Sequence, residues 1–241
     1  MAMERAKTGI PKLDEILNGG IPRGNTVLIS GSPGTGKTLL GWQFLYMGAT
    51  KYNEAGIFLS MEERPRDMRR NLSNFGWDIE ALEDENMIAI IDAATPKIGL
   101  PSREKYVEPK PFDIDSLMYK VHRISKEINA KRFVLDSIPA LGFRLDDAQI
   151  RDSIFKVNAL LLEIGCTSLL TSEKPEPYGY NRYKIAEYIA HGLILLELTE
   201  KRGELKRSLV VVKMRGTKHS MKIYPFEITN EGIVILSGEL Y

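Results

Sequence analysis

"GSPGTGKTLL", residues 31–40, is the stretch that decides the expected fold. Its first eight residues, called the phosphate loop below, match the pattern G-x-x-x-x-G-K-[ST] at every defined position. The loop follows an apolar run, "TVLIS", and opens a segment in which Leu40, Phe44 and Met47 recur at helical spacing. A strand, a glycine-rich turn and a helix in this order predict a loop that binds phosphate.

The loop residues have separate expected roles. Glycines let backbone amides approach a phosphate closely, and the positive end of the following helix faces the same anion. We expect Lys37 to reach the β- and γ-phosphates and the Thr38 hydroxyl to bind Mg²⁺. The predicted contacts to the nucleotide in this segment are Gly31, Ser32, Pro33, Gly34, Thr35, Gly36, Lys37, Thr38 and Leu39.

Two further predicted strand ends carry carboxylates. Asp136 closes "RFVLD", where a carboxylate binds Mg²⁺ through water, with an ordinary turn residue as the alternative. Glu62 and Glu63 close "GIFLSMEE". Because the second strand neighbours the phosphate-loop strand in many such sheets, we expect this pair to orient the attacking water. A solvated acidic pair is the alternative.

Short apolar runs alternate with helix-period segments, which is the pattern of an α/β fold with a doubly wound, mostly parallel sheet. Three later runs, "GLILLEL", "SLVVVKM" and "GIVILS", predict antiparallel strands that extend one edge of it. Residues 94–113 contain four prolines and many charges, and they predict a long surface loop. The remaining predicted strands are 56–61, 87–93, 132–137 and 167–172, and the helices follow Pro65 and cover 117–128 and 150–164.

Composition restricts the function classes. The 241 residues are 43% apolar and 27% charged, as in soluble globular proteins, and we expect one domain over residues 1–241. A net charge of +1 gives no global basic field for nucleic acid or a membrane. The single Cys166 excludes an intramolecular disulfide and a multi-cysteine metal site. No run resembles a signal peptide or a membrane span, so the expected location is the cytoplasm.

Six stretches, in chain order, resemble the KaiC-like branch of the RecA/RadA superfamily. They are "TGIPKLDEILNGGIPRG", "GSPGTGKT", "SMEERPRDMRRNLSNFGWD", "FVLDS", "LLTSE" and "KMRGTKHSMKIYPFEIT". The glutamate pair and "KMRGTKH" are more specific to this branch than the phosphate loop is. The chain resembles one stand-alone domain of the archaeal type with a RecA-like P-loop fold, whereas the cyanobacterial clock protein has two such domains in tandem.

This resemblance implies Mg²⁺-dependent ATP hydrolysis by a homo-oligomeric ring, usually a hexamer, with the nucleotide between subunits. It implies that Glu62 is the general base and that Glu63 is its family-specific neighbour. It also implies that Ser172 and Glu173 sense the γ-phosphate. A regulatory or signalling role is the expected use of this hydrolysis.

The resemblance further implies that Lys213, Arg215 and His219 reach the ATP of the neighbouring subunit, and Met214 is predicted to bind nucleotide with them. Lys213 and Arg215 are two apart on a predicted strand, so they point to one face, where an anion would relieve their repulsion. An edge strand protected by charge is the alternative. Met214 points to the opposite face and is most simply core.

Some positions match the family less closely. Thr229 and Asn230 match a pair near the nucleotide, although the clock protein has Asp at the second position. His191 replaces a common Asp. The Ser-Thr pair that the clock protein's second domain autophosphorylates falls at Glu187 and Tyr188, so we expect hydrolysis without that autokinase activity.

Two other function classes stay open. Four arginines lie in "RPRDMRRNL" (64–72), and Arg66 and Arg70 are spaced for one helix face. DNA binding of the RadA-paralogue kind is one alternative, against a solvated or interface face. A nucleotide-gated scaffold that binds partners through residues 94–113 is the other.

Overall fold

The computed structural model describes residues 3–110, 113–142, 145–174 and 183–236. Within them, ten strands form one sheet, and β1 (Arg5–Ala6) pairs with β2 (Ile21–Pro22) in a separate hairpin. From one edge to the other, the strands of the large sheet are β12 (Gly232–Ile235), β11 (Tyr224–Thr229), β10 (Glu204–Met214), β9 (Gly192–Lys201), β3 (Thr26–Gly31), β8 (Thr167–Glu173), β7 (Arg132–Asp136), β4 (Gly56–Ser60), β5 (Ile88–Asp92) and β6 (Tyr106–Val107).

The pairing of neighbouring strands changes from parallel to antiparallel once along this sheet. Every neighbouring pair from β9 to β6 is parallel, and β9, β10, β11 and β12 are successively antiparallel. This confirms the predicted parallel sheet with an antiparallel C-terminal extension. One detail was wrong: "GLILLEL" lies in β9, which is antiparallel to β10 but parallel to β3. β9 runs in the same direction as β3, so both strands begin at the same end of the sheet.

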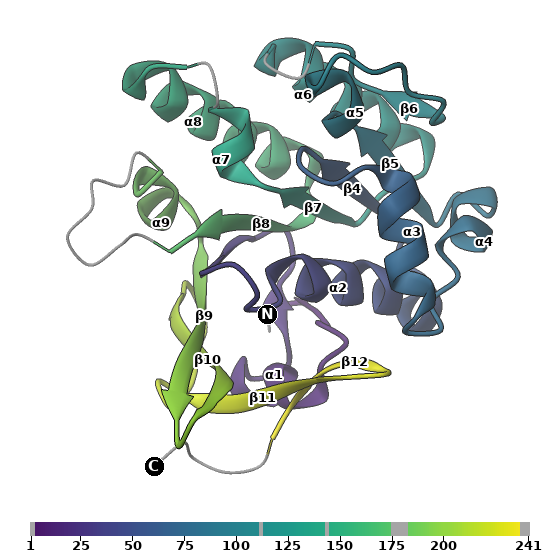
Figure 1. Cartoon of the computed structure of the whole chain (residues 1–241). Coiled ribbons are helices and arrows are strands. Elements are labelled where there is room, and N and C mark those ends of the chain that lie inside the picture. The colour runs from purple at the N-terminus through teal and green to yellow at the C-terminus, as the bar shows by residue number, and fades with distance from the viewer. Residues whose placement is uncertain (1–2, 111–112, 143–144, 175–182, 237–241) are drawn as a thin grey trace.

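Helices cover both faces of the sheet (Figure 1). One hydrophobic core contains residues of α1 (Pro11–Ile16), α2 (Lys37–Tyr52), α3 (Pro65–Ser73) and α4 (Ile79–Asp84). The other contains residues of α6 (Ile114–Glu127), α7 (Ile138–Leu141), α8 (Asp147–Ile164) and α9 (Ile185–Ile189). The doubly wound prediction is therefore confirmed.

The central strands supply side chains to both cores. On β3, Ile29 lies in the first core and Leu28 in the second, and on β7 Val134 and Leu135 divide in the same way. Successive side chains of a strand point to opposite faces, so each of these strands needs an unbroken apolar run. The free thiol of Cys166 is also buried, and burial raises its pKa to about 12.

The predicted surface loop over residues 94–113 is only partly a loop. It contains α5 (Ala94–Lys97) and the edge strand β6, which pairs with β5. Glu108 is fully buried, and its Oε2 lies 3.2 Å from Lys120 Nζ. These elements are too short to produce a periodic apolar pattern, so prolines and charges dominated the prediction. Residues 111–112 lie outside the described part.

Several short elements were not predicted at all, among them α4, α7, α9 and β11. Pro225 is the second residue of β11 and weakens its strand pattern. None of the helices in the described ranges is long and apolar enough to cross a membrane.

Candidate active site

The phosphate loop joins the end of β3 to the start of α2. Gly34 and Gly36 have φ values of +80° and +98°, which residues with a Cβ rarely adopt. A Cβ on Gly31 would lie 2.7 Å from Leu196 O, so no side chain fits there either. Lys37 folds back over the loop, and its Nζ donates to the Gly31 carbonyl at 2.8 Å. The glycines are therefore required by the backbone path.

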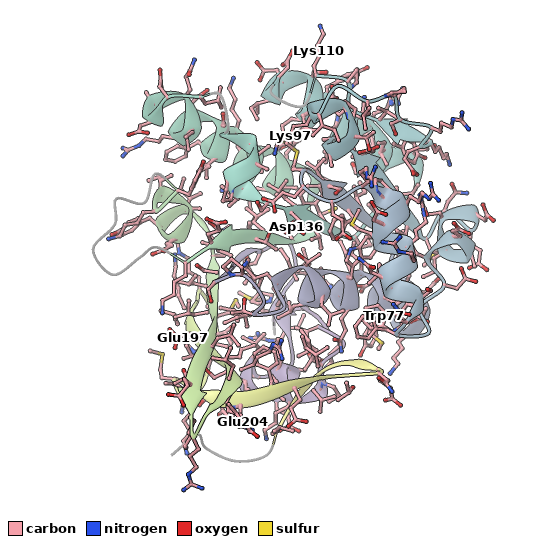
Figure 2. All side chains as sticks on the ribbon, in the orientation of Figure 1. Trp77, Lys97, Lys110, Asp136, Glu197 and Glu204 are labelled. Carbon is pink, nitrogen blue, oxygen red and sulfur yellow. The ribbon has the colours of Figure 1, made fainter. Side chains whose placement is uncertain are left out.

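Thr38 and Asp136 meet across the sheet. Thr38 Oγ1 donates to Asp136 Oδ2 at 2.8 Å, and the Thr171 hydroxyl donates to Asp136 Oδ1. Asp136 ends β7 (Figure 2) and is 7% exposed. Burial raises the pKa of its carboxyl, although the two hydroxyl donors oppose that shift. A hydroxyl and a buried carboxylate are hard oxygen ligands, so this donor set fits Mg²⁺.

The glutamate pair after β4 divides between two environments. Glu62 accepts a hydrogen bond from the Ser137 hydroxyl and lines the same cleft as Lys37. Glu63 turns toward α3, where Asn71 Nδ2 donates to its Oε1 at 2.8 Å. Burial raises the pKa of Glu63, and the Asn71 hydrogen bond opposes that shift. The structure therefore gives the two carboxylates different neighbours.

The reason for expecting Glu62 near the phosphate loop was partly wrong. β4 does not neighbour β3, because β8 and β7 lie between them. Glu62 reaches the site through β7 instead, since Ser60 is level with Asp136 and the Ser137 hydroxyl donates to Glu62. Ser137 was not predicted as a site residue, although it directly follows Asp136.

A cleft of about 450 Å³ brings together about half of the predicted site residues, whereas Gly31, Ser32 and Thr35 of the phosphate loop do not line it. It is lined by the phosphate loop after β3, the segment after β4, the ends of β7 and β8, and Ile228 of β11. Its lining residues are Pro33, Gly34, Gly36, Lys37, Thr38, Leu39, Glu62, Asp136, Ser137, Ser172, Glu173 and Ile228.

An apolar pocket of about 210 Å³ adjoins this cleft, because Thr38, Leu39 and Ile228 line both. α2 and α3 supply its walls, with Trp42 and Phe75 as the aromatic members. Sequence reasoning missed these residues, since an apolar side chain that lines a pocket has the same pattern as one in the core. The pocket makes the cleft long enough to have a polar and an apolar end.

Thr229 follows Ile228 as the last residue of β11, and Asn230 lies in the turn to β12. Thr229 Oγ1 donates to the Gly232 carbonyl at 3.0 Å, and Asn230 is exposed. The structure thus places both beside a residue that lines the cleft, although neither lines it in this chain alone.

The cationic turn, residues 213–217, lies at the end of the strands opposite to the phosphate loop. The strand register makes Gly31 level with Leu196 and Leu209 across β3, β9 and β10. Met214 is level with Val27 instead, which is four residues before Gly31, or about 13 Å along the strand. The chain therefore does not bring Lys213 and Arg215 to its own phosphate loop.

Both cations of this turn are held by backbone carbonyls. Lys213 Nζ donates to Ala190 O at 2.6 Å, and Arg215 Nη2 donates to Tyr188 O at 3.1 Å. Arg215 is exposed, and Lys213 is half-buried. The prediction that they share a face is confirmed, since both reach the end of α9. Met214 is 4% exposed and lies in the core, so its side chain does not join this surface.

Two histidines lie near this turn. His191 Nδ1 accepts a hydrogen bond from the Thr26 amide at 3.3 Å. Burial lowers the pKa of His191, and Arg215 and Lys213 lower it further. His219 is half-buried, and its Nδ1 lies 3.1 Å from the Ser220 carbonyl. The lowered pKa favours the neutral form of His191, at the position where the resemblance leads one to expect an Asp.

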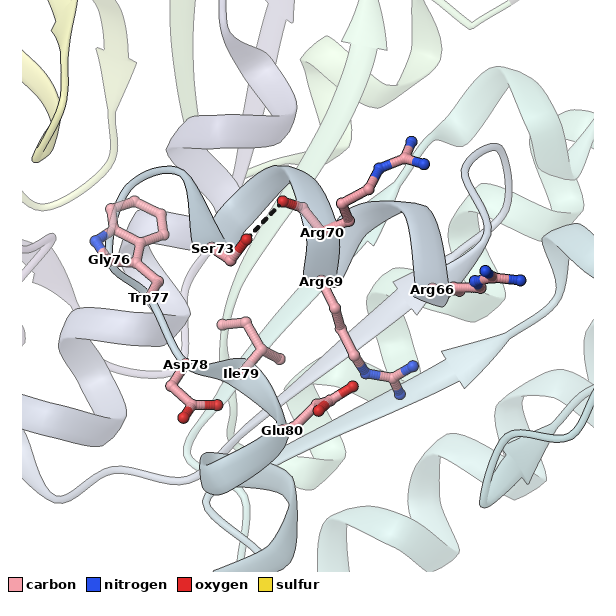
Figure 3. Close-up of a pocket in the computed structure, with 9 residues that line it drawn as sticks. All are labelled: Arg66, Arg69, Arg70, Ser73, Gly76, Trp77, Asp78, Ile79 and Glu80. Atoms are coloured by element: carbon pink, nitrogen blue, oxygen red, sulfur yellow. Dashed lines mark hydrogen bonds between the residues drawn. The ribbon is translucent and has the colours of Figure 1, made fainter.

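The arginines of α3 are largely paired with acids. Figure 3 shows Arg66, Arg69 and Arg70 on α3, opposite α4. Arg69 contacts Glu83 and Glu104, which raise its pKa. The guanidinium groups of Arg64 and Arg70 lie 2.8 and 3.4 Å from Asp67. This arrangement favours the reading of a solvated face over a concentrated cationic surface.

Comparison with known proteins agrees with this geometry. A family model described as "ATPase: KaiC" matches residues 6–239. A UPF0273 protein of Methanocaldococcus jannaschii is 46% identical over 97% of this chain and 96% of its own. The crystal structure of a KaiC-like protein of Pyrococcus horikoshii is 45% identical, with a TM-score of 0.85 over 98% of this chain and all of that one.

The chain is also similar to one part of a longer protein. The circadian clock oscillator protein KaiC of Parathermosynechococcus lividus is 38% identical over 96% of this chain and 42% of its own length. The match thus spans less than half of the clock protein and nearly the whole of this sequence. With the phosphate loop and its carboxylates in one cleft, the chain belongs to the KaiC family of ATPases.

Proposed function

We propose that this chain binds ATP with Mg²⁺ and hydrolyses it in the cleft between the phosphate loop, β7 and β4. The contact between Thr38 and the buried Asp136 beside the phosphate loop carries this proposal. Thr38 and Asp136 would hold Mg²⁺, which when bound neutralises charge on the β- and γ-phosphate oxygens. Lys37 supplies a second positive charge at the same phosphates once its Nζ leaves the loop carbonyls.

Glu62 is the proposed general base. Its carboxylate lines the phosphate cleft, and the Ser137 hydroxyl holds it beside Asp136. From there it would accept a proton from the water that attacks the γ-phosphate. Ser172 and Glu173 line the same cleft from β8, so they are proposed to contact the γ-phosphate side.

The base of the nucleotide is proposed to enter the adjoining apolar pocket. The polar cleft and this pocket share Leu39 and Ile228, so one elongated ligand fits both. Leu39, Phe75 and Ile228 offer the apolar surface that a planar base requires. Thr229 and Asn230 follow Ile228 and would contact the base or sugar from the outer side.

The site is proposed to be shared between subunits of a ring, a hexamer as the resemblance to the KaiC-like branch implies. Lys213 and Arg215 lie too far from their own phosphate loop to contact its nucleotide, yet Arg215 is exposed. In a head-to-tail assembly every interface joins the same two faces. The cationic turn and His219 of one subunit would then meet the triphosphate of the next.

The clock oscillator relative supports a regulatory or signalling use of this hydrolysis, and the cytoplasm is the proposed location. The paired arginines of α3 leave DNA binding with less support, and no further observation favours the scaffold function.

The first experiment measures ATP hydrolysis with and without Mg²⁺ in wild type and in Lys37→Ala. The matched control is Lys51→Ala, because Lys51 is an exposed lysine in the last turn of the same helix. Hydrolysis should require Mg²⁺ and disappear in Lys37→Ala, while Lys51→Ala keeps the wild-type rate. An unchanged rate in Lys37→Ala would contradict the proposal.

The second experiment tests the shared site by mixing two inactive variants. Lys37→Ala spoils only the phosphate-loop face, and Arg215→Ala spoils only the cationic face. In rings mixed at equal amounts, about a quarter of the interfaces join two intact faces. Activity should return on mixing. If native mass spectrometry shows mixed rings without activity, the shared site is wrong.

A further inference from the structure

Arg5 connects the N-terminal hairpin to the cationic turn. It lies on β1 and is half-buried. Its Nη1 donates to the carbonyls of Leu17 and Gly20 at 3.1 and 3.0 Å, and to Thr217 Oγ1 at 2.9 Å. The last contact joins residues 212 positions apart in the chain. One guanidinium group therefore ties the N-terminal segment to the turn that carries Arg215.

The backbone around Arg5 is shaped to let this contact form. Gly19 and Gly20 have φ values of +114° and +120°, which favour glycine. A Cβ on Gly19 would lie 3.2 Å from Arg5 Cδ, and one on Gly20 would lie 2.4 Å from Ala6 O. The "NGG" sequence after α1 thus lets the loop wrap closely around the Arg5 side chain.

Thr217 is the last residue of the cationic turn. Its amide donates to the Met214 carbonyl at 3.2 Å, and Gly216 between them has a φ of +70°. Arg215 lies inside this turn, and its own amide donates to His191 O at 2.8 Å. The β10 side of the turn is therefore held by β9 and the core, whereas the Thr217 side is held by Arg5.

We propose that Arg5 is a positioning residue for ATP hydrolysis in the neighbouring subunit. By holding Thr217, it fixes the turn in the conformation that presents Lys213 and Arg215 to the nucleotide of the next chain. Arg5 itself does not contact that nucleotide. The proposal rests on the shared site proposed above, and it assigns a task to the N-terminal hairpin.

The test compares Arg5→Ala, Arg5→Lys and Thr217→Val in the full chain. Thr217→Val removes only the acceptor of the link and keeps the shape of the side chain, so the contacts of Arg5 to Leu17 and Gly20 stay possible. Both Arg5→Ala and Thr217→Val should lower kcat, by about 10- to 100-fold if the turn moves by about an ångström. Arg5→Lys keeps a donor and should recover part of the rate. Thermal melts check that each variant is folded.

The double variant Arg5→Ala/Thr217→Val distinguishes a link from two separate roles. If the hydrogen bond between them is what matters, the double variant should be no slower than the slower single variant. Losses that multiply would mean that Thr217 acts independently of Arg5, and they would overturn the proposal. So would a wild-type kcat in Arg5→Ala.

Mixed rings then show which face Arg5 serves. Arg5→Ala mixed with Lys37→Ala should gain activity, because random mixing joins two intact faces at about a quarter of the interfaces. Arg5→Ala mixed with Arg215→Ala should gain none, because every cationic face is then damaged. The opposite pattern, or a gain in neither mixture, would overturn the proposal.

The Lys37→Ala and Arg215→Ala mixture is the control for the shared site. If that control stays inactive in mixed rings, the proposed shared site fails, and this inference fails with it. If the control regains activity while the Arg5 variants behave otherwise than described, only the inference about Arg5 is overturned.

Discussion

The hydroxyl of Thr38 donates a 2.8 Å hydrogen bond to the carboxylate of Asp136, which is 98 residues away in the chain. Asp136 is buried at the end of β7, and its other oxygen accepts from Thr171 on β8. The sheet order places β8 next to β3 and β7 next to β8, which brings these three side chains together. The proposed metal ligands are thus set by strand order.

Asp136→Asn should stabilise the nucleotide-free protein while abolishing Mg²⁺-dependent hydrolysis. Burial raises the pKa of Asp136 in the folded chain, so above a pH of about 4 the unfolded state releases this proton first. The free energy of unfolding therefore falls as the pH rises through the interval up to the folded pKa. The amide of Asn cannot ionise, so that loss should vanish.

Thermal melts of Asp136→Asn and wild type between pH 4 and 8, without Mg²⁺ or nucleotide, check this. For a chain of this length, a gain of about 1 kcal/mol raises Tm by roughly 2–4 °C. A lower Tm for Asp136→Asn at neutral pH would contradict the expected sign.

Glu62→Gln should bind ATP normally but hydrolyse it about 10²- to 10⁴-fold more slowly, because a general base is lost. Glu63→Gln is the matched control, since Glu63 lines the apolar pocket and accepts from Asn71 instead. Single-turnover hydrolysis and equilibrium nucleotide binding separate the two effects. If only Glu63→Gln is slow, the two carboxylates exchange roles.

Ile228→Ala should raise KM for ATP by about tenfold and change kcat little, because an apolar contact to the base is made equally before and during hydrolysis. Val234→Ala is the control, since Val234 lies on the adjacent strand β12 and is 44% exposed. Steady-state kinetics give KM and kcat for both variants. Equal KM values would contradict the proposal that the base of the nucleotide contacts Ile228.

No phosphoprotein should accumulate when the chain is incubated with γ-labelled ATP. By the resemblance given in the sequence analysis, a glutamate, Glu187, and a tyrosine, Tyr188, are expected at the two positions of the clock protein's phosphorylated Ser-Thr pair. A denaturing gel followed by phosphoamino-acid analysis is the measurement. Label on Ser or Thr would revive an autokinase function.

DNA binding should be weak and depend little on salt. Arg64, Arg69 and Arg70 contact carboxylates, so they release few counterions from DNA. Affinities for duplex DNA at several salt concentrations, for wild type and Arg66→Ala, test this. A steep salt slope that Arg66→Ala reduces would restore DNA binding as a function.

The sequence predicted the parts of the site that are local. The phosphate loop needs only a strand, glycines and a helix in succession, so the sequence of residues 31–38 is enough to predict it. Asp136 and Glu62 were found because each ends or follows a clear apolar strand. Ser137 and Ile228 were missed, since a lone serine and an apolar strand residue carry no pattern that distinguishes a cleft from a turn or a core.

Long-range register accounts for what the sequence did not reveal. The expectation that β4 lies next to β3 was wrong, because strand order is decided by crossovers that leave no local pattern in the sequence. The distance between Arg215 and its own phosphate loop depends on how β10 pairs with β9, and that pairing includes a shift between Val211 and Lys213. The contact of Arg5 to Thr217 likewise joins residues 212 positions apart, so no local pattern in the sequence indicates it.

The separation of Gly31 and Met214 along the sheet has a consequence for the dependence of activity on protein concentration. If the active site is shared as proposed, a single subunit has the phosphate loop and the cationic turn at opposite ends of its strands and therefore has no complete active site. On the proposed shared site, output would rise more steeply than in proportion to the amount of protein. Dilution would dissociate the subunits and stop hydrolysis, so the concentration of the protein in the cell would determine whether ATP is hydrolysed.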